Sequence, residues 1–219
     1  MSALARASTV KSTTPKTSST MKVLIDAGHG IGTPGKRSPD GKFREWAFNR
    51  IIAQAIVKHL VFRGYDAELL VPEDEDVPLI LRCARVFKHT YTLGKENVIL
   101  ISVHVNAAGN GKEWKKAQGW SCYTSVGETK ADRLGTCLAE SALKNLPGQK
   151  MRFDYSDGDP DQEAKFYILN GTQCPAVLTE NLFMDNHEHL AFLSSEEGQK
   201  AIVALHVEGI VNYIKGGEG

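Results

Sequence analysis

Four residues whose side chains can bind a metal ion or move a proton stand at informative places in the chain. They are His29, Glu45, His104 and Glu180. His29, His104 and Glu180 each follow a short apolar run rich in β-branched residues, as is typical of parallel strands buried on both faces. Ligands of open α/β sheets bind outside the carboxyl ends of such strands. We therefore expect these three side chains to converge at one edge of a sheet.

The fourth residue, Glu45, opens a helical pattern after a loop rich in glycine and proline. Catalytic zinc takes about three protein ligands from His and carboxylate groups and leaves one position open. His29, Glu45 and His104 can supply such a set, which predicts a metal site. Taken singly, each has a simpler explanation, because a helix dipole favours a carboxylate at its start and a strand-end histidine can merely be hydrogen-bonded. The combination with Glu180 favours the metal site.

Glu180 follows four residues of buried-strand type, and a carboxylate at that depth needs a partner or a purpose. A general base beside the metal site is one such purpose, and we predict this catalytic role for Glu180. The alternative is a salt bridge with a Lys or Arg elsewhere in the chain.

Strand and helix patterns alternate along the chain. Strands are expected from Met21 up to His29, over residues 67–71, 98–103, 120–125 and 166–169, and over the run that ends at Glu180. Helices are expected over residues 45–63, 78–94 and 130–145, and after a capping box at residues 194–197. This alternation predicts an α/β fold with one twisted, mostly parallel sheet flanked by helices on both faces.

The length of 219 residues, with 42% hydrophobic and 24% charged residues, is typical of a single globular domain. We expect a disordered Ser/Thr-rich tail at residues 1–20, one folded domain at 21–216 and a flexible C-terminus at 217–219. The four cysteines are scattered singly, which favours reduced thiols over a disulfide framework or zinc ribbon.

Several classes of protein are disfavoured. Lys plus Arg and Asp plus Glu both total 26, so no net charge attracts nucleic acid. No run approaches the ~20 apolar residues of a membrane span, and residues 1–20 lack the apolar core of a signal peptide.

Two nucleotide-binding patterns overlap in the glycine loop. Residues 30–35 match G-x-G-x-x-G, and residues 30–37 fail the P-loop pattern only at Arg37. Both motifs require a helix to begin at the glycines, whereas Pro39, Asp40 and Gly41 interrupt the chain there. We treat these matches as coincidental. No G-x-S-x-G motif is present, which disfavours a serine nucleophile.

Four pieces of the chain match a known family in order and spacing: residues 26–30 (DAGHG), Glu45, residues 102–107 (SVHVNA) and residues 175–186 (PAVLTENLFMDN). With them the chain resembles the zinc-dependent N-acetylmuramoyl-L-alanine amidases of bacteria and phages, from about residue 22 to residue 214. The resemblance implies that 21–216 is a catalytic domain, with His29, Glu45 and His104 as zinc ligands and Glu180 as the catalytic glutamate. It also implies peptidoglycan as substrate, cut between the lactyl group of N-acetylmuramic acid and L-alanine.

Two alternatives remain within this resemblance: a zinc peptidase acting on stem or cross-bridge peptides, and a peptidoglycan-binding module without turnover. The family often has a second glycine where this chain has Ile31, and no cell-wall-binding repeat is visible. We expect a monomer made in the cytoplasm that acts on the cell wall after release or delivery, as a phage lysin or a cargo protein does.

Overall fold

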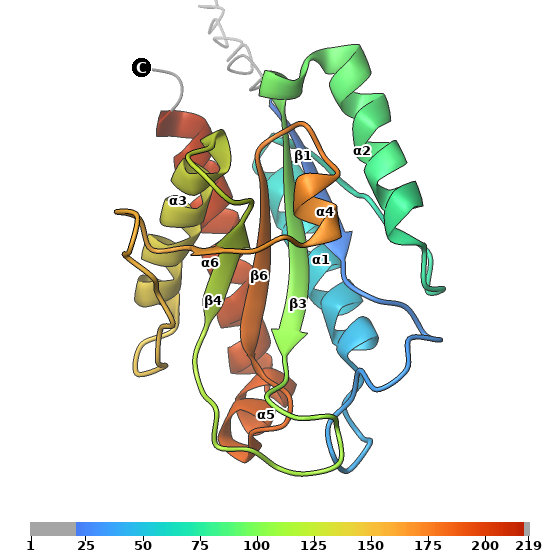
Figure 1. Ribbon diagram of the computed structural model, residues 1–219, viewed down its shortest axis with the longest axis vertical. Helices are drawn as coiled ribbons and strands as arrows, with labels where there is room; N and C mark the ends of the chain where they lie inside the picture. Colours follow the sequence, from blue (N-terminus) through green and yellow to red (C-terminus); the bar gives the residue numbers. More distant parts are fainter. Residues whose placement is uncertain (1–20, 217–219) are drawn as a thin grey trace, which may run out of the picture.

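A computed structural model describes residues 21–216. The expected tail at 1–20 and C-terminus at 217–219 lie outside the described residues. The strands are β1 (Lys22–Ala27), β2 (Asp66–Leu69), β3 (Val98–Asn106), β4 (Ser121–Thr124), β5 (Gln162–Glu163) and β6 (Ala176–Phe183) (Figure 1). The helices are α1 (Glu45–Phe62), α2 (Leu79–Leu93), the 3₁₀ turn η1 (Lys95–Asn97), α3 (Lys130–Asn145), α4 (Tyr167–Asn170), α5 (His187–Ser194) and α6 (Glu196–Gly216).

The strands form one sheet in the order β2-β1-β3-β6-β4-β5. The pairs of β1 with β2, β1 with β3, and β3 with β6 are parallel, whereas β4 runs antiparallel to β6. Helices cover both faces of this sheet. The expected α/β fold with a mostly parallel sheet is therefore confirmed.

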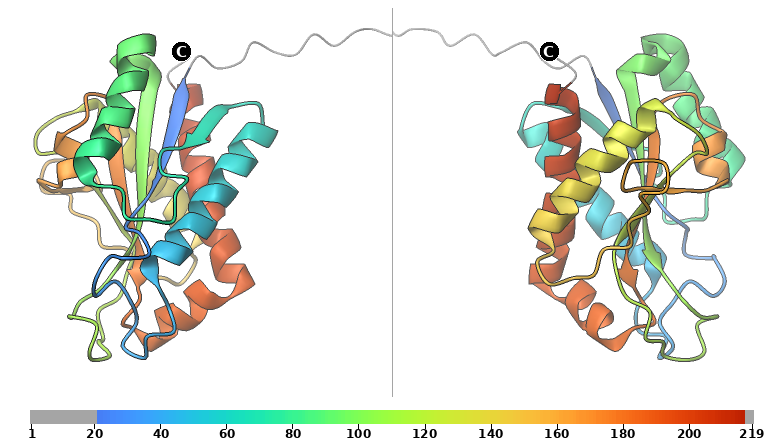
Figure 2. Two further views of the ribbon diagram at one scale, coloured as in Figure 1. Left: turned by 90° about the vertical axis from the view of Figure 1, so that its right-hand side faces the viewer. Right: turned by 60° about the vertical axis from the view of Figure 1, so that its left-hand side comes forward.

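The helices divide the core into two layers. In Figure 2, α2 lies on one side of the sheet while α1 and α6 lie on the other. Odd-numbered residues of the central strands, such as Ile25 and Ile101, pack with α1, α3 and α6 in the larger core cluster. Even-numbered residues, such as Leu24 and Leu100, pack with α2 and α4 in the smaller one. Both faces are buried because the sheet lies between helices, which explains the unbroken apolar runs.

Local signals set two of the helices. α3 spans the predicted residues 130–145, and Thr129 and Asp132 form a reciprocal capping box at its start. α1 begins at Glu45 rather than at the glycines of residues 30–35. The glycine loop therefore lacks the helix N-terminus that phosphate binding at either nucleotide motif requires.

The strand predicted over residues 166–169 is wrong, because this segment forms the short helix α4. A four-residue apolar run fits either a strand or a turn of helix, and only packing decides between them. Here Ile168 and Leu169 are buried beside α2, while Tyr167 is half exposed.

The predicted capping box at residues 194–197 is also wrong. Ser194 ends the unpredicted helix α5, and Ser195 instead accepts the Gly198 N–H at 3.0 Å to cap α6. The start of α5 is marked by Asn186, whose side chain accepts two backbone N–H groups.

Within residues 21–216 no helix combines the length and apolar character needed to cross a membrane.

Candidate metal centre

The register of the sheet brings four polar side chains to one face. Side chains alternate between faces along a strand, so Ser102 and His104 of β3 point to the same side. Asp26 of β1 is the register partner of Ser102, and Glu180 of β6 is the partner of His104. Leu24 of β1 and Leu100 of β3 point to this same face and pack with α2 and α4. The polar row therefore lies on the α2 side, at the carboxyl ends of the strands.

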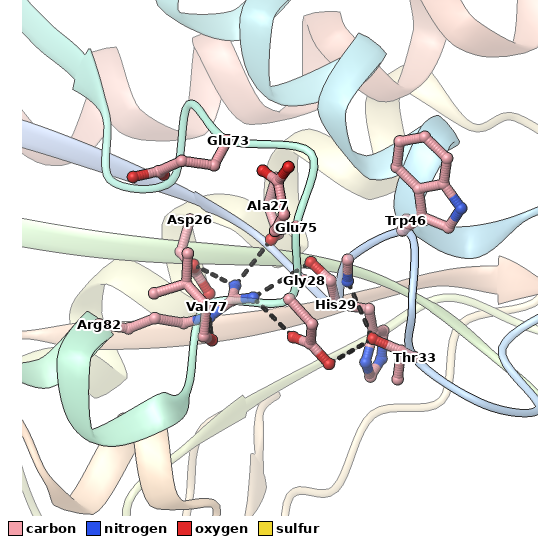
Figure 3. Close-up of polar contacts among 12 residues, drawn as sticks. Asp26, Ala27, Gly28, His29, Thr33, Trp46, Glu73, Glu75, Val77 and Arg82 are labelled. Atoms are coloured by element: carbon pink, nitrogen blue, oxygen red, sulfur yellow. Dashed lines mark hydrogen bonds and ion pairs between the residues drawn. The ribbon is translucent and has the colours of Figure 1, made fainter.

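His29 lies in the turn after β1 with φ of 64°, a left-handed conformation that residues other than glycine rarely adopt. Two arginines hold this turn: the His29 carbonyl accepts hydrogen bonds from Arg50 Nη1 at 3.0 Å and from Arg82 Nη2 at 3.1 Å. In Figure 3 the Arg82 guanidinium contacts both the side chain of Asp26 and the backbone of this turn. Neighbouring Gly28 has no room for a side chain, because a Cβ there would overlap the imidazole of His104.

Glu45 reaches the same place from the opposite layer. It is the first residue of α1, and a helix that follows a parallel strand begins at the carboxyl end of the sheet. Its side chain is 1% exposed, and its Oε1 accepts the Val105 N–H at 3.1 Å. The same oxygen lies 3.2 Å from His104 Nδ1 and 3.3 Å from His29 Nε2.

These three residues fit a metal ion. Their nearest ligand atoms all lie within 4.8 Å of one another, and the two imidazole rings are perpendicular with centroids 4.8 Å apart. His29 Nε2 and Glu45 Oε2 are buried without a hydrogen-bond partner. Buried polar atoms are rarely left unpaired. Two imidazoles and one carboxylate are the donor set of a catalytic zinc site.

The electrostatics of the cluster favour a cation. Burial raises the pKa of the Glu45 carboxyl, but its contacts with His104 and His29 outweigh burial and hold the pKa well below the usual range. Burial lowers the pKa of His104, yet Glu45 outweighs it and the pKa is raised. For His29 burial prevails and the pKa is lowered. An ionised carboxylate thus lies between two imidazoles.

Glu180 lies beside this cluster but in a different environment. Its Oε2 is buried without a hydrogen-bond partner, and burial raises the pKa of its carboxyl to about 7. Within residues 21–216 Glu180 forms no ion pair with a Lys or Arg; the nearby Lys36 Nζ lies 4.0 Å from Glu45 Oε2 instead. A carboxyl that gains and loses a proton near neutral pH is suited to general acid–base chemistry.

Three further polar residues belong to this cluster: Asp26, Ser102 and Arg82. Sequence analysis assigned no role in the site to any of them. Arg82 Nη1 lies 2.7 Å from Asp26 Oδ1, and both side chains are almost fully buried. Ser102 Oγ lies 3.2 Å from His104 Nε2. An aspartate at the end of a buried strand was the available signal, since such a carboxylate requires a cationic partner.

An open cleft of about 500 Å³ gives access to the candidate metal centre. Its lining includes His29, His104 and Glu180, together with Lys36 and side chains at the start of α2 and around α4. The cluster is therefore accessible to a ligand from the α2 side of the sheet.

The chain is 27% identical over 197 residues to the endolysin of Bacillus phage SPP1, an alignment that covers 88% of this chain and 65% of the endolysin. The catalytic domain of CwlV, an N-acetylmuramoyl-L-alanine amidase from Bacillus (Paenibacillus) polymyxa, has the same fold, with a TM-score of 0.74 at 22% identity over 89% of this chain and 98% of that domain. The amidase AmiC2 of Nostoc punctiforme also has a TM-score of 0.74, at 24% identity over 91% and 99% of the two chains.

Residues 23–212 match the sequence profile of the N-acetylmuramoyl-L-alanine amidases. This match covers most of the chain and includes all four residues of the cluster. The chain belongs to the N-acetylmuramoyl-L-alanine amidase family.

Proposed function

We propose that the protein is a zinc-dependent hydrolase that cleaves the amide bond between N-acetylmuramic acid and L-alanine in peptidoglycan. The observation that carries this proposal is the convergence of His29, Glu45 and His104 at one point, beside the buried carboxyl of Glu180. The family match and the similarity to a phage endolysin support the choice of substrate.

In this proposal His29, Glu45 and His104 hold one Zn²⁺. Zinc in such a site supplies Lewis-acid chemistry, which polarises an amide carbonyl and makes water more acidic. The Glu45 carboxylate would neutralise half of the charge of the ion, the two imidazoles would bind it as neutral donors, and the cleft leaves the site open to a substrate.

Glu180 moves the proton in this proposal. As a carboxylate it takes a proton from the attacking water, and as a carboxylic acid it gives that proton to the amine nitrogen when the C–N bond breaks. A carboxyl whose pKa is raised to about 7 can do both near neutral pH. Glu45 cannot exchange roles with it, because its pKa is held far lower by the two histidines.

We further propose that residues 21–216 form the catalytic domain, that it acts as a monomer, and that it acts at the cell wall after release or delivery. The family match falls inside this range. Likeness to an endolysin supports action at the cell wall.

Mass spectrometry of digested peptidoglycan tests the function. Purified protein should release intact stem peptides with a free L-alanine amino group and leave glycan chains without peptides. The Glu180→Gln variant, incubated in parallel, should release neither. Shortened stems or opened cross-bridges would identify a peptidase instead, and a protein that stays bound to the wall without releasing anything would be a binding module.

A further inference from the structure

His104 presents two different ring nitrogens to two different neighbours. Its Nδ1 lies 3.2 Å from Glu45 Oε1, on the side where the three candidate ligands converge. Its Nε2 lies 3.2 Å from Ser102 Oγ, on the opposite edge of the ring. A neutral imidazole carries one proton, so only one of its nitrogens has a free lone pair for a metal. The partners of the ring decide which one.

The hydroxyl of Ser102 has its own direction fixed by a third residue. Ser102 Oγ donates its only hydrogen to Asp26 Oδ2 at 2.6 Å. Ser102 is fully buried and Asp26 is 1% exposed, so water does not compete for either group. Having donated its hydrogen, Oγ can only accept from His104, and the proton of the ring must then be on Nε2.

Asp26 is in turn held by Arg82. Arg82 Nη1 donates to Asp26 Oδ1 at 2.7 Å and to the Ala27 carbonyl at 2.8 Å, and Arg82 Nη2 donates to the His29 carbonyl at 3.1 Å (Figure 3). This guanidinium therefore connects the backbone of one candidate ligand, His29, with the hydrogen-bond chain that leads to the other, His104. This series of hydrogen bonds depends on the sheet register, which places Asp26 opposite Ser102.

We propose that Ser102 is a positioning residue of the metal centre, which, held by Asp26 and Arg82, keeps the proton of His104 on Nε2 and directs the lone pair of Nδ1 toward the metal. The inference rests on the proposed zinc function. Hydrogen-bond partners of metal-binding histidines fix the tautomer and orientation of the ring in this way, and their loss typically weakens metal binding by about 10- to 100-fold.

The affinity of the metal-free protein for Zn²⁺, measured by competition with a chelator, tests this role without any turnover. Ser102→Ala removes the hydroxyl but leaves the Arg82–Asp26 ion pair, and it should bind zinc about 10- to 100-fold more weakly than wild type. Ser121→Ala is the matched control. Ser121 is also fully buried in the sheet, but its hydroxyl has no hydrogen-bond partner, so its loss should leave zinc affinity unchanged.

A second readout needs only the wild-type protein. Long-range ¹H–¹⁵N spectra of the zinc-loaded form should show His104 protonated at Nε2 and not at Nδ1. The reverse pattern would overturn the inference, as would wild-type zinc affinity in Ser102→Ala. If wild type itself bound no zinc, the proposed function would fall together with this inference, whereas equal affinity in wild type and Ser102→Ala would remove the role of Ser102 alone.

Discussion

His104 and Glu180 are register partners on the parallel strands β3 and β6, and only His104 also contacts Glu45. Two carboxyl groups therefore flank the same imidazole in different environments. Contacts with His104 and His29 hold the pKa of Glu45 well below its usual range, while burial raises the pKa of Glu180 to about 7. Such a separation assigns different chemistry to two residues of the same type. It predicts a ligand at Glu45 and a proton carrier at Glu180.

The histidines can be tested as ligands by their effect on zinc content. His29→Ala removes a candidate ligand atom that has no other hydrogen-bond partner, so the purified variant should lose its zinc. His187→Ala is the control, since His187 stacks on Trp114 at the start of α5 and lies outside the ligand cluster. Elemental analysis should find about one zinc per chain in wild type and in the control. Full zinc content in His29→Ala would exclude His29 from the ligand set.

A methyl group at Gly28 should disturb the centre without a change of any ligand. A Cβ at this position would lie 2.5 Å from both ring nitrogens of His104, so the ring must move in Gly28→Ala. We expect zinc binding to weaken by at least about tenfold, because ligand geometry decides affinity at such sites.

Gly32→Ala is the control for that change, since a Cβ at residue 32 of the same loop has open space around it. Its zinc affinity, from the same chelator competition, should equal that of wild type. Unchanged affinity in Gly28→Ala would show that the packing of Gly28 on His104 is irrelevant to the metal.

The buried ring of His206 should make the free energy of unfolding depend on pH. Its ring is fully buried in α6, where Nδ1 donates to the Ile202 carbonyl at 2.7 Å and Nε2 accepts from Thr179 Oγ1 at 2.9 Å. Burial lowers the pKa of His206 to about 4, against about 6.5 in an unfolded chain. Between these values the ring of His206 binds more protons in the unfolded state, so the contribution of His206 to the free energy of unfolding falls as pH decreases from about 6.5 to 4. The loss is on the order of 3 kcal/mol at ~1.4 kcal/mol per pKa unit.

Urea denaturation at pH 7, 6, 5 and 4 measures this loss against a variant without the ring. The Asn side chain of His206→Asn does not titrate in this window, so the free energy of unfolding of the variant should lack the decrease that His206 causes in wild type, whatever its stability at pH 7. Parallel curves for wild type and His206→Asn would show that His206 does not carry the effect.

Much of the fold could be predicted because the signals are local. Apolar runs mark the central strands, and the period of 3.6 marks α1, α2 and α3. The segments that failed are short. Residues 166–169 are four residues whose helical form depends on burial of Ile168 beside α2, and the boundary of α6 depends on whether Ser194 or Ser195 meets the first free N–H groups.

The candidate site was predictable as residue types at strand ends but not as a network. Sequence alone indicates that His104 and Glu180 end buried strands, yet it does not contain the register that makes them partners. The hydrogen-bond chain from Arg82 through Asp26 and Ser102 depends on that register and on where α2 packs. These are tertiary relationships between segments far apart in the chain, and hydrophobic periodicity carries no information about them.

The division of labour between the two glutamates is the central claim, and paired substitutions test it most directly. Zinc content and turnover on peptidoglycan should be measured in parallel for Glu180→Gln and Glu45→Gln. Glu180→Gln keeps the shape of the side chain and removes the proton carrier, so it should retain zinc while kcat falls by about 10²-fold or more. Glu45→Gln should lose zinc, and added zinc should restore part of the activity. Full activity in Glu180→Gln, or loss of zinc from Glu180→Gln with zinc and turnover intact in Glu45→Gln, would contradict the account.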